Sequence, residues 1–189
     1  MTEPNFTETP NPKLTVVDKL RMLLDITQKI SLSLDLEEVI TQVMDTLGSL
    51  IPYSAAGIYI IEKNPTGNSP YIFKSKSIRG YNISFELVEP RLNMGEGFIG
   101  SVAQSGQPII CADVSKDSRY FAARPQTNSE MVAPIISNNS VIGVFDLESD
   151  DFNAYNEDDL SVLILLAAQV AIIIEKVELH EQVVEKKRL

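Results

Sequence analysis

The sequence predicts an α+β fold in which helices from both ends of the chain cover one face of an antiparallel sheet. Three observations support it: helical spacing of apolar residues over the first fifty residues, short β-branched runs separated by turns in the middle, and an apolar helical pattern after residue 156. The chain has 189 residues, of which 44% are hydrophobic and 22% charged. It is therefore long and apolar enough to bury one sizeable core.

The N-terminal part predicts two helices after a polar lead-in. Residues 1–13 contain three prolines and few apolar side chains, so we expect them to be disordered. The first helix starts near Leu14, and the second is capped by Ser33 or Asp35. Gly48 and Pro52 bracket the end of the second helix.

The central part predicts five short strands and one short helix. Strands at residues 55–61 and 71–78 form a hairpin, and a helix follows that Gly106 closes. A strand at 108–112 comes next, then a polar, irregular insert at 113–129. Strands at 131–136 and 141–147 form a second hairpin, and their apolar residues on both faces indicate a sheet covered on both sides.

The last helix begins after Asn156, which we expect to cap it. Apolar residues at seven-residue spacing predict a coiled-coil seam along it, formed by Leu163, Val170, Val177 and Val184 with Ala167 and Ile174. Beyond Glu175 the helix is mostly charged. We therefore expect one domain over residues 14–178 and a charged helical linker over residues 179–189 that leads to a further, output domain.

Charge and composition exclude several classes of partner and site. The net charge of −10 repels phosphate backbones and anionic membranes, so neither nucleic acid nor membrane is an expected partner. The single cysteine, Cys111, excludes an intrachain disulfide, and with a single histidine it leaves no structural zinc site. The N-terminus lacks the pattern of a signal peptide, and the longest apolar stretch is shorter than the roughly 20 residues of a membrane span. We therefore expect a cytoplasmic protein.

An ordered series of motifs runs from Gly95 to Leu160. Its elements are a glycine-rich loop, an apolar strand ending in Asp113, the segment Asp117-Ser118-Arg119-Tyr120, the strand 129–134, the strand 142–149, and the start of the last helix. In this order they resemble the GAF domain family, and the resemblance covers about residues 16–178. It implies a five- or six-stranded antiparallel sheet with the terminal helices on one face and a ligand pocket between the other face and the insert. It also implies a homodimer formed through the terminal helices.

Departures from the family narrow the expected function. Glu148-Ser149 stands where cyclic-nucleotide-binding members carry an Asn-Lys pair, and the insert lacks the cysteine and histidine of bilin-binding members. Members that reduce free methionine sulfoxide use several cysteines, whereas this chain has Cys111 alone. We therefore expect that this segment is not an enzyme and binds no cofactor.

The resemblance then implies a regulatory domain that senses an unknown small molecule. Ligand binding would be relayed through the terminal helices to a phosphatase, kinase or cyclase output domain. The alternative is a dimerisation module of the same fold whose pocket is filled by its own side chains.

Strand alternation and family position select the residues expected to line the pocket: Tyr59, Phe73, Ser75, Phe98, Ile99, Asp113, Tyr120, Phe121, Ser129, Met131 and Asp146. Asp146 is either a polar anchor for the ligand or a carboxylate satisfied by backbone donors. Asp113 caps the insert or contacts the ligand, and Tyr120 and Phe121 stack on the ligand or close the pocket. Cys111 is expected to be an inert, small apolar side chain.

Overall fold

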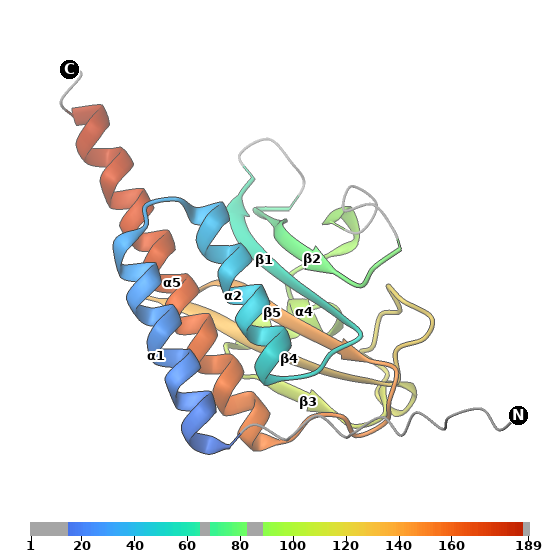
Figure 1. Ribbon diagram of the computed structural model, residues 1–189. Helices are drawn as coiled ribbons and strands as arrows, with labels where there is room; N and C mark the ends of the chain where they lie inside the picture. The colour runs from blue at the N-terminus through green and yellow to red at the C-terminus, as the bar shows by residue number, and fades with distance from the viewer. Residues whose placement is uncertain (1–14, 65–68, 83–88, 187–189) are drawn as a thin grey trace, which may run out of the picture.

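The sheet has five antiparallel strands in the order β2-β1-β5-β4-β3 in the computed structural model, which describes residues 15–64, 69–82 and 89–186 (Figure 1). The α-helices are α1 (Val16–Leu32), α2 (Leu36–Leu50), α4 (Gly97–Ser105) and α5 (Glu157–Lys186). The strands are β1 (Ala55–Lys63), β2 (Tyr71–Arg79), β3 (Ile109–Cys111), β4 (Ser129–Ser137) and β5 (Ser140–Ser149). Two short 3₁₀ helices, η1 (Glu89–Arg91) and η2 (Val114–Lys116), lie in the connections. The predicted α+β class is confirmed.

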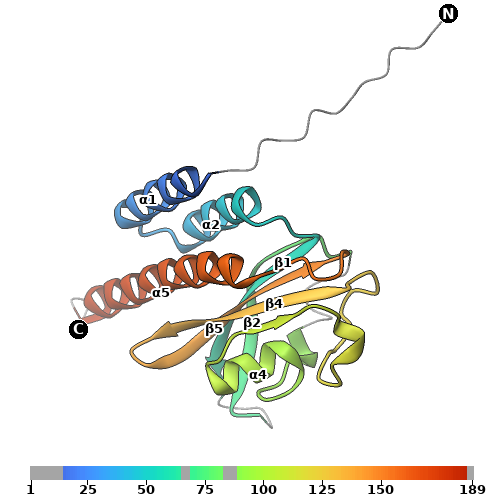
Figure 2. The same cartoon turned by 90° about the horizontal axis from the view of Figure 1, so that it is seen from below.

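Three helices cover one face of the sheet, and α4 covers the other with the loops around it (Figure 2). Helices α2 and α5 pack nearest the strands, and α1 lies outside them. The predicted placement of the terminal helices on a single face is therefore confirmed. The predicted disordered lead-in at 1–13 lies outside the described residues.

Side-chain caps fix where the helices begin. Thr15 and Asp18 form a capping box at the start of α1. Asp35 rather than Ser33 caps α2, accepting the N–H groups of Glu37 and Glu38 at 3.0 Å. Asn156 caps α5 as predicted, because its Oδ1 accepts the N–H groups of two following residues at 2.8 and 3.1 Å. Gly106 ends α4 in the left-handed conformation, at φ 68°.

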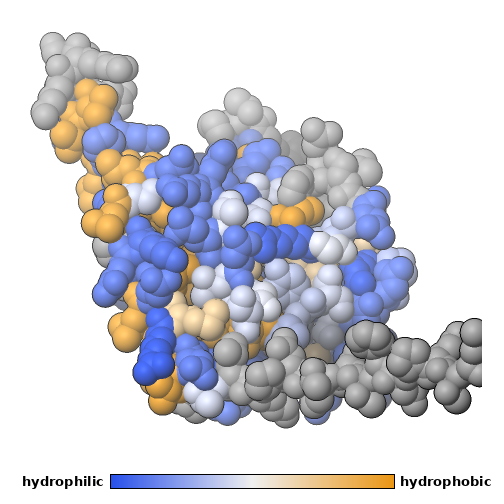
Figure 3. All heavy atoms as spheres, in the orientation of Figure 1, coloured by the Kyte–Doolittle hydropathy of each residue, from blue (hydrophilic) through white to orange (hydrophobic). Residues whose placement is uncertain are grey.

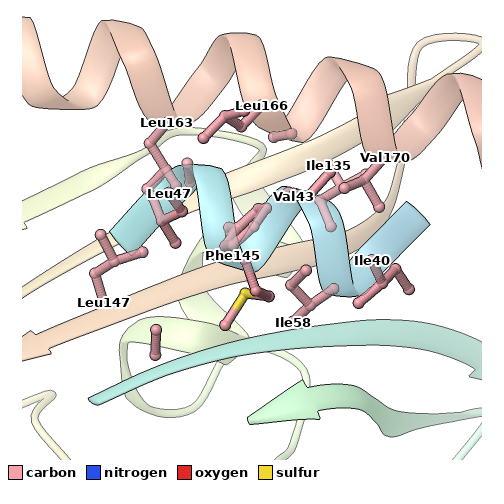
Figure 4. Packing of buried hydrophobic residues seen from close by; sticks show 14 of the residues in the cluster. Ile40, Val43, Leu47, Ile58, Ile135, Phe145, Leu147, Leu163, Leu166 and Val170 are labelled. Carbon is pink, nitrogen blue, oxygen red and sulfur yellow. The ribbon is translucent and has the colours of Figure 1, made fainter. Parts of the chain in front are cut away.

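The main core lies between the sheet and the helices α2 and α5 (Figure 4). Alternate strand residues point into it, including Ile58, Ile135, Phe145 and Leu147. The residues predicted to form a coiled-coil seam on α5 are largely part of this core: Leu163, Ala167, Val170 and Ile174 are all buried. The spacing of these four residues therefore reflects packing of α5 on its own sheet, and contact of the helix with a second chain stays a prediction.

Helix α5 is long and apolar enough over Glu157–Val184 to span a membrane by length and composition alone. However, 44% of its most apolar window is buried inside the fold. A core helix passes the same test, and α5 packs along β4 and α2.

A second set of apolar side chains remains exposed on the outer side of α1 and α5. It gathers along the edge of the molecule where these helices run (Figure 3). We call it the outer helical stripe and define it by Val17, Leu20 and Leu24 of α1 and Leu165, Ile172 and Leu179 of α5. The residues on α1 are three and four positions apart and those on α5 are seven apart, which are the spacings of helix-packing surfaces.

Candidate functional site

A cavity of ≈ 140 Å³ lies between α4 and the sheet face that the terminal helices leave free. Its floor comes from β1, β4 and β5, and its walls come from the loop before α4 and the insert after η2. The lining residues are Tyr59, Tyr81, Arg91, Leu92, Glu96, Gly97, Phe98, Ile99, Phe121, Ala123, Glu130, Asp146 and Glu148.

Three carboxyl groups stand together on the floor of this cavity. Glu130 of β4 pairs with Glu148 of β5, and Asp146 lies two residues before Glu148 on the same strand. Paired residues and residues two apart share one face of a sheet, so all three side chains point away from the helices. Each is at most 5% exposed. We call them the carboxyl cluster.

Hydroxyl groups donate hydrogen bonds to Asp146 and Glu148, and the carboxyl groups of Asp146 and Glu130 share a further one. Tyr81 donates to Asp146 Oδ2 at 2.9 Å and contacts Glu148 Oε1 at 2.5 Å. The Thr127 hydroxyl donates to the other oxygen of Glu148. Asp146 Oδ1 is buried and has no hydrogen-bond partner among the described residues. Because buried polar atoms are normally paired, this oxygen is open to a further hydrogen-bond donor.

Burial makes these groups reluctant to ionise. It raises the pKa of Asp146 to about 8, and the nearby charge of Glu148 acts in the same direction. Burial, followed by the charges of Asp146 and Glu148, raises the pKa of Glu130 well above its ordinary value. Burial also raises the pKa of Glu148, although hydrogen bonds from Thr127 and Tyr81 and the charge of Arg124 oppose it. The cluster titrates as a unit and holds at least one proton at neutral pH.

Tyr59 fits on the floor of the cavity because the residue under its ring, Gly57, has no side chain. Gly57 pairs with Asp146 across β1 and β5, and the Tyr59 ring lies over it. A Cβ atom at residue 57 would stand 2.6 Å from that ring. Tyr59 is therefore held against the carboxyl cluster, and burial, followed by the charge of Asp146, raises its pKa.

The insert is fastened to α4 at the wall of the cavity. Arg119 binds Asp117 with two hydrogen bonds, of 3.0 and 2.7 Å, and its guanidinium lies 5.3 Å from the Phe98 ring centre. These hydrogen bonds from Arg119 lower the pKa of Asp117 to about 2. Phe121, which is 46% exposed, packs near Gly97 at the start of α4. The Asp-Ser-Arg-Tyr segment thus holds one wall of the cavity in place.

Cys111 lies beside the carboxyl cluster but does not line the cavity. It pairs with Glu130 across β3 and β4, so Cys111, Glu130 and Glu148 form one row over three strands. The thiol is partly buried, and this burial raises its pKa. From the sequence we expected Cys111 to be an inert, small apolar side chain and did not place it next to these carboxyl groups.

The structure separates the expected pocket residues into two groups. Tyr59, Phe98, Ile99, Phe121 and Asp146 line the cavity. The others do not, and each has a structural role instead. Met131 faces the helices because it is one residue out of phase with Glu130, and Ser129 donates to the backbone oxygen of residue 151 at 2.6 Å.

The remaining expected residues support the walls from behind. Phe73 and Tyr120 belong to the smaller apolar cluster under α4. Ser75 binds Glu89 of η1 through its backbone N–H at 2.8 Å and through its hydroxyl. Asp113 caps η2 by accepting the N–H of Ser115 at 3.1 Å. Of the two readings of Asp113, the structure favours the cap.

Sequence reasoning missed Glu130, Glu148 and Tyr81. The alternation of Asp146 and Glu148 in an otherwise apolar strand was a usable signal, because it places two acids on one face. Glu130 could be assigned to the site only once the pairing register of β4 and β5 was known. Tyr81 could be assigned only once the position of the segment after β2 in the folded chain was known.

Within the described residues there is no group of three or more side chains placed to hold a metal ion.

The order of strands, the helices on one face and the cavity under the insert define a known family. A family model for the GAF domain matches residues 33–175. The chain belongs to the GAF family. The five-stranded sheet falls within the range that the resemblance implied.

Several similar proteins are enzymes. The chain is 27% identical over 115 residues to the free methionine-R-sulfoxide reductase of Escherichia coli. These residues make up 61% of this chain and 62% of that protein. It is 34% identical over 77 residues to the enzyme of the same name from Saccharomyces cerevisiae, covering 40% and 43%. The chain thus matches less than two thirds of the length of these curated relatives.

A solved structure supports the fold. The chain superposes on free methionine-R-sulfoxide reductase from Neisseria meningitidis in complex with its substrate with a TM-score of 0.74, at 19% identity and over 95% and 99% of the two chains. The expectation of a sensory GAF domain that is not an enzyme is wrong, because the two sequence relatives described above are enzymes. That expectation rested on the single cysteine and on the assumption that reduction requires an internal disulfide.

Proposed function

We propose that this GAF protein reduces free methionine sulfoxide, with the carboxyl cluster binding the substrate and Cys111 supplying the thiol. The observation that carries the proposal is the row of Cys111, Glu130 and Glu148 on one sheet face, next to the cavity floor. The two enzyme relatives act on a free amino acid that carries a sulfoxide, as their names state.

The cavity suits a small ligand with a positively charged group. Three buried carboxyl groups attract an ammonium ion, and the unpaired Asp146 Oδ1 accepts one of its N–H groups. An ammonium ion also favours the ionised form of the carboxyl groups, so binding it at neutral pH releases protons. The apolar side chains of Leu92, Phe98 and Ile99 offer the remaining wall to a short side chain such as that of methionine sulfoxide.

The same cluster can supply the proton that the reaction consumes. Cys111 lies beside the cavity, so the sulfoxide end of the ligand has to extend past Glu130 to reach it. Because burial raises the pKa of the Cys111 thiol, an ionised carboxyl of the cluster must first accept its proton. The thiolate then attacks the sulfoxide sulfur, and a protonated carboxyl of the cluster gives its proton to the sulfoxide oxygen. The hydroxyl group then moves from the substrate sulfur to the Cys111 sulfur. The sulfur–sulfur bond breaks with its electron pair on the substrate, which leaves methionine and a sulfenic acid on Cys111. One external thiol then forms a mixed disulfide with Cys111 and releases water, and a second restores the thiol. A single cysteine thus suffices when external thiols are present.

The need for external thiols agrees with a reducing compartment. We infer that the protein works in the cytoplasm, where thiols are kept reduced. This inference rests on the free cysteine and on the proposed reaction.

The test is turnover of free methionine-R-sulfoxide with dithiothreitol as the external thiol, followed by chromatography of the methionine released. The wild-type protein should release methionine, and Cys111→Ser should abolish release while binding the substrate as tightly in calorimetry. Ser105→Ala, an exposed change on α4, serves as the control and should keep full activity. Equal activity of Cys111→Ser would remove Cys111 from the reaction. Substrate binding without turnover by the wild type would refute the reductase proposal.

A further inference from the structure

We infer that Arg91 is a specificity-determining residue that binds the carboxylate of the ligand, so that the cavity reads both charges of a free amino acid. This inference rests on the proposed function. Arg91 lines the same cavity as the carboxyl cluster, and it forms no ion pair with any residue that the structure describes. By contrast, Arg79, Arg119 and Arg124 are each paired with an aspartate.

A side-chain anchor holds Arg91 at the cavity. Arg91 is the last residue of η1, and Glu89 is the first. The Glu89 carboxylate accepts the Ser75 N–H at 2.8 Å, the Ser75 hydroxyl, and Lys74 Nζ at 3.3 Å. Although burial favours the neutral acid, these hydrogen bonds hold the pKa of Glu89 below its ordinary value. The ionised Glu89 thus ties η1 to β2 and fixes the backbone from which Arg91 extends.

The cavity then has opposite charges in different places. Its floor carries the carboxyl cluster, with the unpaired oxygen of the fully buried Asp146. Its wall carries the exposed Arg91 and the first residues of α4, Gly97 to Ile99, beside which no side chain caps the helix. Glu96 also lies in this wall, where its carboxylate accepts a hydrogen bond from Asn93 at 3.1 Å. The N–H groups at the start of a helix attract anions, so they act together with the guanidinium. An α-amino acid carries both an ammonium and a carboxylate, and it matches this arrangement.

Arg91 therefore explains why the cavity would select a free amino acid over an amide of the same amino acid. When the carboxylate of the ligand is replaced by an amide, the guanidinium loses its charged acceptor while the ammonium end is unchanged. A hydrogen bond between charged groups is stronger than a neutral one, which corresponds to roughly a tenfold to hundredfold difference in affinity.

The experiment measures binding of methionine sulfoxide and of its carboxamide to the full chain by calorimetry. The wild type should prefer the acid roughly tenfold to a hundredfold. Arg91→Gln should remove the preference by weakening the acid only, and Arg91→Lys should restore part of it. Glu89→Gln should lower the preference to an intermediate value, because it loosens η1. Arg21→Gln, an exposed change on α1, is the matched control and should change neither affinity.

The outcomes separate this inference from the proposed function. Equal binding of acid and amide by the wild type, or an unchanged preference in Arg91→Gln, would overturn the role of Arg91 and leave the reductase proposal standing. A purely structural role of Arg91 would weaken both ligands alike, which also overturns the inference. Failure of the wild type to bind either ligand would refute the proposed function itself.

Discussion

The carboxyl cluster should make the protein less stable as the pH rises from 5 to 8. In the unfolded chain an aspartate ionises near pH 4, whereas burial in the folded protein raises the pKa of Asp146 to about 8. Between these values the folded state holds a proton that the unfolded state has released, so stability is greatest at low pH and is lost as the pH rises through this window. Each retained proton lowers the free energy of unfolding by about 1.4 kcal/mol per pH unit.

The size of the effect follows from one retained proton over three pH units. It amounts to about 4 kcal/mol, which for a domain of this size corresponds to a decrease in Tm of roughly 10 °C. Glu130, whose pKa is also raised, can only add to it. The assay is urea unfolding followed by circular dichroism at pH 5, 6, 7 and 8.

A variant assigns the effect to the cluster. Asp146→Asn removes a titrating group and should flatten the slope by up to about 1.4 kcal/mol per pH unit. Asp151→Asn changes an exposed aspartate just after β5 and should leave the slope unchanged. A free energy of unfolding that stays constant or rises from pH 5 to pH 8 in the wild type would refute the reasoning, as would an unchanged slope in Asp146→Asn.

Three further predictions concern the glycine loop, the hydroxyl above the cluster and the outer helical stripe. Gly100→Ala should cost about 1–3 kcal/mol in urea unfolding, because the new Cβ would stand 1.9 Å from the backbone oxygen of Asn93; a cost near zero would contradict that close approach. Tyr81→Phe should cost about 1–3 kcal/mol and more at pH 8 than at pH 5, since its hydroxyl stabilises ionised carboxylates, and an equal cost at both pH values would argue against this role. Self-association through the terminal helices stays a prediction: Ile172→Glu should lower the mass measured by light scattering, and Ile136→Glu, also exposed but on the β4–β5 hairpin, should not. A mass that is the same for the wild type and both variants would rule out the outer helical stripe as the contact.

The sequence was sufficient for the elements and for their layers, because periodicity and capping act locally. Asn156 and Gly106 mark helix ends through contacts within four residues, and both were found. The face of the sheet on which each strand side chain lies was harder to predict. Met131 was placed in the pocket although it is one residue out of phase, and a shift of one residue moves a strand side chain to the opposite face.

The site itself depends on contacts that no local pattern contains. Glu130 and Glu148 meet because β4 and β5 pair in one register. Tyr81 reaches Asp146 and Glu148 from a segment more than sixty residues earlier. Four of the six residues predicted to form a seam on α5 pack in the core instead, for a related reason. A seven-residue repeat predicts that a helix has a packing face, but it does not say whether a sheet or another chain covers that face.

The pairing of the central strands has a consequence for the order of folding events. Strand β1 pairs with β5, which joins residues 55–60 to residues 143–148. Contacts so distant in sequence form slowly, because a long loop must close before they can. Tyr59 and Asp146 meet only after that closure, and the buried acid takes up its proton when its surroundings become dry. Refolding at neutral pH should therefore consume protons in its slowest phase, after the helical signal has appeared, and a pH-indicator dye in a stopped-flow experiment would time the completion of the cavity floor.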